Sequence, residues 1–96
     1  MARDIQERAF AFALQIATLE RDDAYRAIVR RALVSQLVRS AMSVGANLEE
    51  ATGAQSKADF IAKVSVARKE CREAQYWLRL GQHAGVIQRK DWPALG

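Results

Sequence analysis

The sequence has only one cysteine, one proline, one histidine and five glycines among its 96 residues. With a single cysteine, Cys71, an intramolecular disulfide framework is excluded, and one thiol is typical of a protein from a reducing compartment. Proline and glycine are the residues that most often interrupt helices, and here alanine, leucine, arginine, glutamate and glutamine dominate instead. The composition therefore predicts an almost wholly helical chain with little room for strands.

Long apolar runs are also absent. The most apolar stretch, residues 9–19, is too short to span a membrane and is interrupted by Gln15 and Thr18. Asp4 and Glu7 precede this stretch, at positions where a secretory signal would carry positive charge. We therefore expect a cytoplasmic protein that does not use a membrane as a partner.

Residue patterns that support enzymatic chemistry are missing as well. Neither His83 nor Cys71 has a neighbour at the spacing of a metal site or a catalytic triad. Glu49 and Glu50 are adjacent, so they point in different directions on a helix and do not form a cooperating carboxylate pair. We expect no catalytic residue, no metal and no cofactor, and an enzyme that uses His83 or Glu50 is the least favoured interpretation.

Apolar residues recur at alternating steps of three and four in three segments, which places them on one stripe of a helix. The second of these helices is expected from about Ala24 to Ala51. The three stripes expected to form the core are Ile5, Ala9, Phe12, Ile16 and Leu19; Val34, Leu37, Ala41, Val44 and Leu48; and Phe60, Val64, Ala67, Cys71, Ala74 and Leu78. Phe10, Ala13 and Ala17 widen the first stripe, and Val38 and Gly45 widen the second.

Polar residues and glycine mark the boundaries between these helices. Asp22 or Asp23 can cap the second helix by accepting a backbone N–H bond. Gly53 suits the left-handed position just beyond a helix end, and Ser56-x-x-Asp59 is typical of a capping box that starts the third helix. Because these connections are short, the helices are predicted to pack as an antiparallel up-down bundle.

The C-terminal residues predict the start of a fourth helix. Residues 91–93, Asp-Trp-Pro, resemble a helix start in which proline is tolerated in the first turn. Too few residues follow for a full-length helix, so either a longer native chain or assembly would complete the bundle. The predicted fold is all-α, with one domain over residues 1–96 that contains three long helices and the start of a fourth.

The charge distribution indicates a partner. The formal net charge is +4, and residues 56–96 carry eight basic and four acidic groups. A helical projection at about 100 degrees per residue separates the basic from the acidic side chains of the third helix. The candidate nucleic-acid contacts are Lys57, Arg68, Arg72 and Arg79 on one flank, with Arg39 from the second helix, whereas Asp59, Glu70 and Glu73 fall on another flank. The alternative is a solvated or ion-paired face.

Two further stripes have structural interpretations. Val66, Trp77 and Leu80 lie off the core stripe of the third helix and are candidates for an oligomer interface, unless a broad single-chain core buries them. On the second helix, a polar stripe on the side away from Val34 and Ala41 suits interhelical hydrogen bonds better than catalysis. That polar stripe contains Gln36, Ser40, Ser43 and Asn47.

Several motifs carry a family resemblance. The serine-rich helix over residues 35–53 ends in Asn47-x-x-Glu50, the chain restarts with Ser56-Lys-x-x-Phe60, and residues 72–78 contain Tyr-Trp-Leu. In these features, which cover most of the chain, the sequence resembles the bacterial four-helix bundle proteins of the 23S ribosomal RNA intervening-sequence family. The first helix differs from the family pattern because it lacks the usual aromatic-rich opening.

The resemblance implies a four-helix protomer that forms a ring-shaped homo-pentamer with a nucleic-acid role. More distantly, the family is similar to accessory proteins of diversity-generating retroelements, which form basic pentamers and cooperate with a reverse transcriptase on nucleic acid. We therefore predict a non-enzymatic homo-oligomer that binds an RNA or DNA backbone through its basic helix face. The alternative is a structural or protein-interaction scaffold that recruits a protein partner and has no nucleic-acid ligand.

Overall fold

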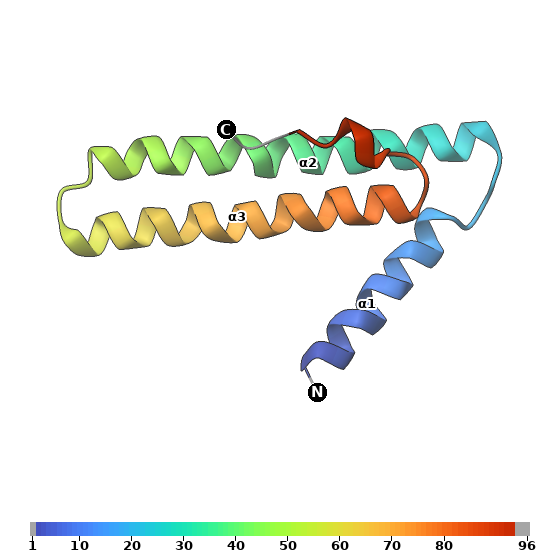
Figure 1. Cartoon of the computed structure of the whole chain (residues 1–96), viewed down its shortest axis with the longest axis horizontal. Helices are drawn as coiled ribbons and strands as arrows, with labels where there is room; N and C mark the ends of the chain where they lie inside the picture. The colour runs from blue at the N-terminus through green and yellow to red at the C-terminus, as the bar shows by residue number, and fades with distance from the viewer. Residues whose placement is uncertain (1, 94–96) are drawn as a thin grey trace. The chain divides into compact units, whose positions relative to one another are not determined.

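The computed structural model describes residues 2–93, and this range is all-α and contains no strand (Figure 1). It contains the helices α1 (Ala2–Ala17), α2 (Asp23–Thr52) and α3 (Lys57–His83), followed by one 3₁₀ turn, η1 (Arg89–Asp91). The prediction of an all-α fold with three long helices is therefore confirmed.

The predicted start of a fourth helix is not found in the described residues. The chain forms only the single turn η1 there, and Trp92 has the extended dihedrals φ −66° and ψ 129°. Trp92 precedes Pro93, and the proline ring disfavours helical dihedrals at the residue before it. Residues 94–96, in which a fourth helix would continue, lie outside the described range.

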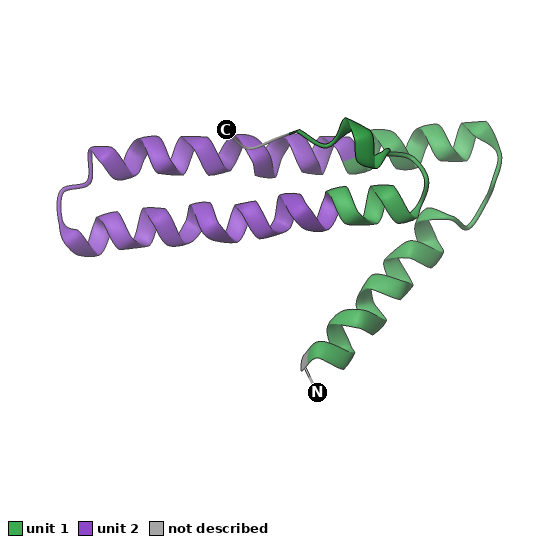
Figure 2. Cartoon of the chain, in the orientation of Figure 1, with its two compact units in different colours: residues 1–33, 78–96 green, residues 34–77 purple. Residues whose placement is uncertain are grey.

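The chain divides into two compact units (Figure 2). The first unit contains residues 1–33 and 78–96, and the second contains residues 34–77. Both boundaries fall inside α2 and α3 rather than in loops. The prediction of a single domain over residues 1–96 stays a prediction.

Side chains cap the starts of α2 and α3 as the sequence predicts. Asp22 Oδ1 accepts the Tyr25 backbone N–H at 2.8 Å, so Asp22 is the cap of α2. Ser56 Oγ accepts the Asp59 backbone N–H at 3.0 Å, and Asp59 Oδ2 accepts the Gln55 N–H at 3.4 Å. These bonds satisfy backbone donors that have no partner inside the first helical turn.

The two helix ends that follow use different glycine geometries. Gly85, after α3, has a φ of 76°, and the N–H groups of Gly85 and Val86 bond to the carbonyls of Gln82 and Gly81. This is a Schellman motif, which requires the left-handed conformation that glycine adopts without strain. The left-handed position predicted for Gly53 is wrong, because Gly53 N–H bonds to Glu50 O at 3.1 Å in a tightened last turn.

In the first unit, α1 packs through the residues predicted to widen its stripe, Phe10, Ala13 and Ala17, and not through the centre of that stripe. Phe10 is buried, and its ring meets the His83 ring edge to face at a centroid distance of 5.5 Å. Leu14 and Ala17 on α1 are half-buried. The predicted core stripe is instead exposed, with Ile5, Phe12, Ile16 and Leu19 at 65%, 63%, 48% and 65%. Helix α1 is apolar on two faces, so its periodicity did not decide which face packs.

In the second unit, α2 packs through part of its predicted apolar stripe, with Val34, Leu37 and Val44 half-buried, and also through part of its polar stripe. Ser40 is fully buried, whereas Ala41 and Leu48 of the predicted stripe are exposed. Ser40 Oγ donates to Gln36 O at 3.0 Å, and Asn47 Nδ2 donates to Ser43 O at 2.8 Å. These polar groups make their hydrogen bonds within α2, and not to another helix as predicted. Their burial therefore leaves no hydrogen bond unmade.

The predicted stripe of α3 is largely confirmed. Within the second unit Ala67 is buried, and Val64, Cys71 and Ala74 are half-buried. Phe60 is the exception, because it is 48% exposed. The inward face of this helical hairpin therefore consists mainly of small side chains.

Candidate nucleic-acid interface

Three of the predicted basic contacts lie on one exposed flank of α3 in the second unit. Lys57, Arg68 and Arg72 are all exposed. At about 100 degrees per residue, these three positions fall within roughly 60 degrees of one another around the helix. Among residues 2–93, none of the three takes part in an ion pair. We call Lys57, Arg68 and Arg72 the basic flank.

Two acidic side chains of α3, Glu70 and Glu73, form ion pairs with α2. Arg39 on α2 pairs with Glu70 at 3.2 Å and also pairs with Glu73. The basic flank therefore projects from a helix whose glutamates are already neutralised. The predicted separation of basic and acidic flanks on α3 is confirmed, while Arg39 itself has a structural role in joining the two helices.

A second ion pair joins the same helices. Lys63 Nζ on α3 lies 3.1 Å from Glu50 Oε1 on α2. The hydrogen bond to Glu50, together with the charge of that carboxylate, raises the pKa of Lys63 above its ordinary value. The ion pair holds the Lys63 ammonium against α2 and away from the basic flank.

Arg79, the remaining predicted contact, belongs to the first unit. Its guanidinium lies 3.9 Å from the centroid of the Phe10 ring, the geometry of a cation–π contact. Arg79 is still exposed, but its planar group rests on an aromatic ring. Arg79 therefore helps α1 to pack on α3, whether or not it also binds an anion.

The predicted oligomer interface is only partly exposed. Leu80 is buried at 5% exposure within the first unit, so it presents no surface to another subunit. In the second unit, Val66 is 38% exposed, and Trp77 is half-buried with its ring edge to face on Tyr76. The predicted interface therefore loses Leu80 and retains Val66 and the exposed part of Trp77.

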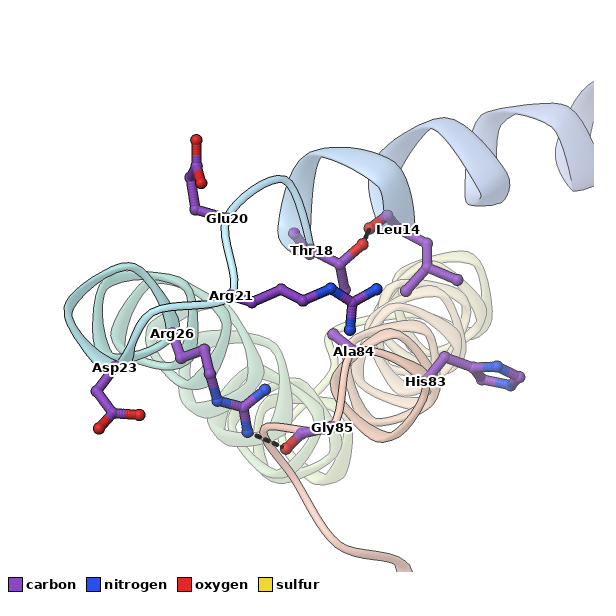
Figure 3. Close-up of a pocket in the computed structure, with 10 residues that line it drawn as sticks. Leu14, Thr18, Glu20, Arg21, Asp23, Arg26, His83, Ala84 and Gly85 are labelled. Carbon is purple, nitrogen blue, oxygen red and sulfur yellow. Dashed lines mark hydrogen bonds between the residues drawn. The ribbon is translucent and has the colours of Figure 1, made fainter.

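A cavity of about 640 Å³ lies within the first unit (Figure 3). It is lined by the end of α1, the α1–α2 connection, the start of α2 and the end of α3, including Thr18, Arg26 and His83. Arg26 Nη2 donates to Gly85 O at 2.7 Å, and the Glu20 and Asp23 carboxylates point away from this guanidinium. Charges of both signs surround the cavity, so it does not present a focused site for an anion.

Sequence reasoning missed the role of two arginines in this unit. Arg26 donates to Gly85 O, and Arg30 donates to Val86 O, so both arginines satisfy carbonyls just beyond the end of α3. Gly85 marks the end of α3, where the last carbonyls need hydrogen-bond donors from elsewhere. Nothing in the sequence, however, indicates that the donors come from 59 and 56 residues earlier.

The described residues contain neither a metal-binding cluster nor a membrane-spanning helix. In residues 2–93, no group of three or more histidine, cysteine, aspartate or glutamate side chains is arranged to hold a metal ion. No helix in the same range combines the length and apolarity needed to cross a membrane.

Comparisons with known proteins agree with the resemblance read from the sequence. The family model described as 23S rRNA-intervening sequence protein matches residues 2–95, which is nearly the whole chain. No curated protein and no solved structure matches the chain.

Proposed function

Because the chain belongs to the 23S rRNA-intervening sequence protein family, we propose that it is a non-enzymatic homo-oligomer that binds the backbone of RNA or DNA. The oligomer is a ring, a pentamer if it follows the proteins that this family resembles. No catalytic step and no cofactor are part of this proposal.

The observation that carries the nucleic-acid proposal is the unpaired basic flank. Lys57, Arg68 and Arg72 are exposed together, while Glu70 and Glu73 of the same helix are bound to Arg39. Arginine presents a planar fork of donors that matches phosphate oxygens, and each phosphate it neutralises releases counterions. The flank therefore offers a favourable electrostatic surface to a polyanion.

The composition of the flank also favours recognition of the backbone over recognition of bases. On the same side of α3, Ile61 and Ser65 lie between these charges and Gln75 follows Arg72, and none of the three has an aromatic ring on which a base stacks. Contacts to phosphates position a protein without reading sequence. We therefore expect binding that tolerates changes of sequence and weakens steeply with salt.

The first prediction tests the flank directly. Single- and double-stranded RNA and DNA are titrated with the protein and with the Arg68→Gln/Arg72→Gln variant at low and moderate salt, with helicity checked by circular dichroism. The loss of two phosphate contacts should reduce the salt slope of log K by roughly 1.5 to 2 and weaken binding at least tenfold.

The control removes the same charge elsewhere. Arg8→Gln/Arg31→Gln changes two exposed residues outside α3 and should leave affinity within about threefold of the unmodified protein. Equal losses in both variants would mean that net charge alone drives binding and would discard the basic flank. Absence of binding to all four probes at low salt would overturn the nucleic-acid proposal.

A protein-interaction scaffold is the alternative, and it is favoured by the exposed apolar side chains Val38, Met42 and Leu48. In that case the exposed apolar surface recruits a protein and the charge provides solubility. Trp77→Ala separates the two functions. Loss of a protein partner with nucleic-acid binding absent would favour the scaffold, whereas loss of assembly with unchanged nucleic-acid affinity would assign Trp77 to the subunit interface.

A further inference from the structure

The charges of the basic flank fall into two groups along α3. Arg68 and Arg72 are four residues apart, about 6 Å along the helix axis, whereas Lys57 lies about 16 Å before Arg68. Ion pairs at two places join this part of α3 to α2, so a helical hairpin fixes the spacing (Figure 2). The basic flank is therefore a straight row of cations, about 22 Å long, with one long gap.

The gap holds two uncharged side chains that are shorter than lysine or arginine. Ile61 and Ser65 lie between Lys57 and Arg68 on the same side of α3, and both are exposed. No hydrogen bond within residues 2–93 uses the Ser65 hydroxyl, which can act as donor and as acceptor. A ligand that lies along the basic flank therefore meets charge at both ends and one hydroxyl group in the middle.

A single-stranded nucleic acid does not match this arrangement. Proteins that bind single strands combine a basic groove with aromatic side chains on which successive bases stack. The basic flank contains no aromatic ring, so unpaired bases would face Ile61, Ser65 or water. A duplex stacks its bases on one another and presents phosphates and sugars, so a surface without aromatic rings is sufficient to bind it.

The two charge groups match the two rows of phosphates on either side of a duplex groove. A helix that lies across a groove places its two ends on opposite rows and its middle over the floor of the groove. A helix that lies along the inside of a groove instead needs cations on two opposite sides to reach both rows. The three cations of the basic flank lie within roughly 60 degrees of one another, so they favour the crossing arrangement.

The groove that fits the gap is the minor groove of an A-form duplex. In B-form DNA the minor groove is only about 6 Å wide, too narrow for the separation of Lys57 and Arg68, and the major groove is about 8.5 Å deep, beyond the reach of Ser65. In double-stranded RNA the minor groove is wide and shallow and displays the 2′-hydroxyl groups. The Ser65 hydroxyl can share a hydrogen bond with a 2′-hydroxyl there, and DNA has no such group.

We propose that the basic flank binds double-stranded RNA across its minor groove. Lys57 binds phosphates of one strand, Arg68 and Arg72 bind adjacent phosphates of the other strand, and Ser65 bonds to a 2′-hydroxyl between them. This inference rests on the nucleic-acid part of the proposed function and names the ligand of the same surface. Because every contact is to phosphate or sugar, base sequence has little influence, and the A-form shape decides which nucleic acid binds.

A titration of four probes tests the class of ligand. Duplex RNA, duplex DNA, single-stranded RNA and single-stranded DNA of matched length and sequence are titrated with the unmodified protein at low and moderate salt. We expect duplex RNA to bind about tenfold more tightly than each of the others, because it alone combines the A-form shape with 2′-hydroxyl groups. Binding of duplex DNA or of a single strand as tightly as duplex RNA overturns this inference and leaves nucleic-acid binding standing. No binding to any probe overturns both proposals.

Ser65→Ala tests the contact inside the groove. This variant should weaken binding of duplex RNA about three- to tenfold, the effect of one hydrogen bond, and leave binding of duplex DNA unchanged. Ser35→Ala changes an exposed serine of α2 in the same unit and should alter neither affinity. Circular dichroism checks that both variants keep their helicity. Equal losses for duplex RNA and duplex DNA, or no loss for duplex RNA, overturn the contact of Ser65 with a 2′-hydroxyl and with it the crossing of the minor groove.

Discussion

At the scale of single residues, the arginines of this protein differ sharply in what they do. Arg26 and Arg30 bind carbonyls beyond α3, Arg39 joins two glutamates, and Arg79 rests on a phenylalanine ring. A formal charge of +4 therefore says little about how much charge is free to meet a ligand. The proposed binding surface depends on those cations that the fold does not use, such as Arg68.

A prediction at this scale concerns Gly81. A Cβ added there would lie 2.6 Å from Ile87 Cδ1 and 2.9 Å from Ile87 Cγ1, too close for either atom. We expect Gly81→Ala to lower the free energy of unfolding by about 1–3 kcal/mol, because overpacking outweighs the gain in helix propensity. Chemical denaturation followed by circular dichroism measures the difference.

A double-mutant cycle supplies the control for Gly81. In an Ile87→Ala background the two closest atoms are gone and only the Cβ, at 3.1 Å, remains, so Gly81→Ala should cost clearly less than in the unmodified protein. If Gly81→Ala costs the same in both backgrounds, contact with Ile87 is not the cause.

At the scale of elements, local signals placed the helix boundaries well but did not decide which faces are buried. Ser56 caps α3 as predicted, and Asp22 is the one of the two predicted aspartates that caps α2, since a capping bond depends on residues within one turn. The apolar periodicities of α1 and α2, in contrast, allow more than one face to pack. In α2 the small side chain of Ser40 is buried in place of Ala41.

A prediction at this scale concerns the start of α3. Ser56→Ala removes the acceptor of the Asp59 N–H bond, so the free energy of unfolding should fall by about 0.5–2 kcal/mol. Ser65→Ala makes the same substitution at an exposed position inside α3, where alanine has the higher helix propensity. Ser65→Ala should be neutral or slightly stabilising, and equal losses in the two variants would exclude capping as the cause.

At the scale of the whole molecule, a chain of 96 residues leaves many large apolar side chains in contact with water. Ile5, Phe12 and Leu19 near the N-terminus and Met42 in α2 are each more than 60% exposed. Small domains bury a limited share of their unfolded surface, and association with further copies increases that share. The proposed homo-oligomer is therefore a source of stability as well as a binding platform.

The prediction at this scale is that apparent stability depends on protein concentration. Assembly stabilises the folded state by mass action, so the midpoint of thermal unfolding should rise by several degrees between about 1 and 100 μM. Differential scanning fluorimetry over this range measures the shift. A midpoint that does not change with concentration, together with a monomeric mass, would contradict the oligomer.

The sequence by itself determined the helical class, the positions of the three helices, the cap at Ser56, a cap at Asp22 or Asp23, and the charge separation on α3. These features depend on residues within one or two helical turns, so local patterns carry them. The sequence also carried the motifs that identify the family, but it did not show that Arg39 is consumed in ion pairs.

Only the tertiary structure decided which helix faces are buried, that Leu80 is enclosed, and which arginines remain free. These outcomes depend on residues far apart in the chain, such as Arg39 with Glu73 and Arg26 with Gly85. A helix that is apolar on two faces satisfies the same periodicity whichever face packs. Which face becomes buried depends on how well the helices fit together, and a local sequence pattern holds no information on that fit.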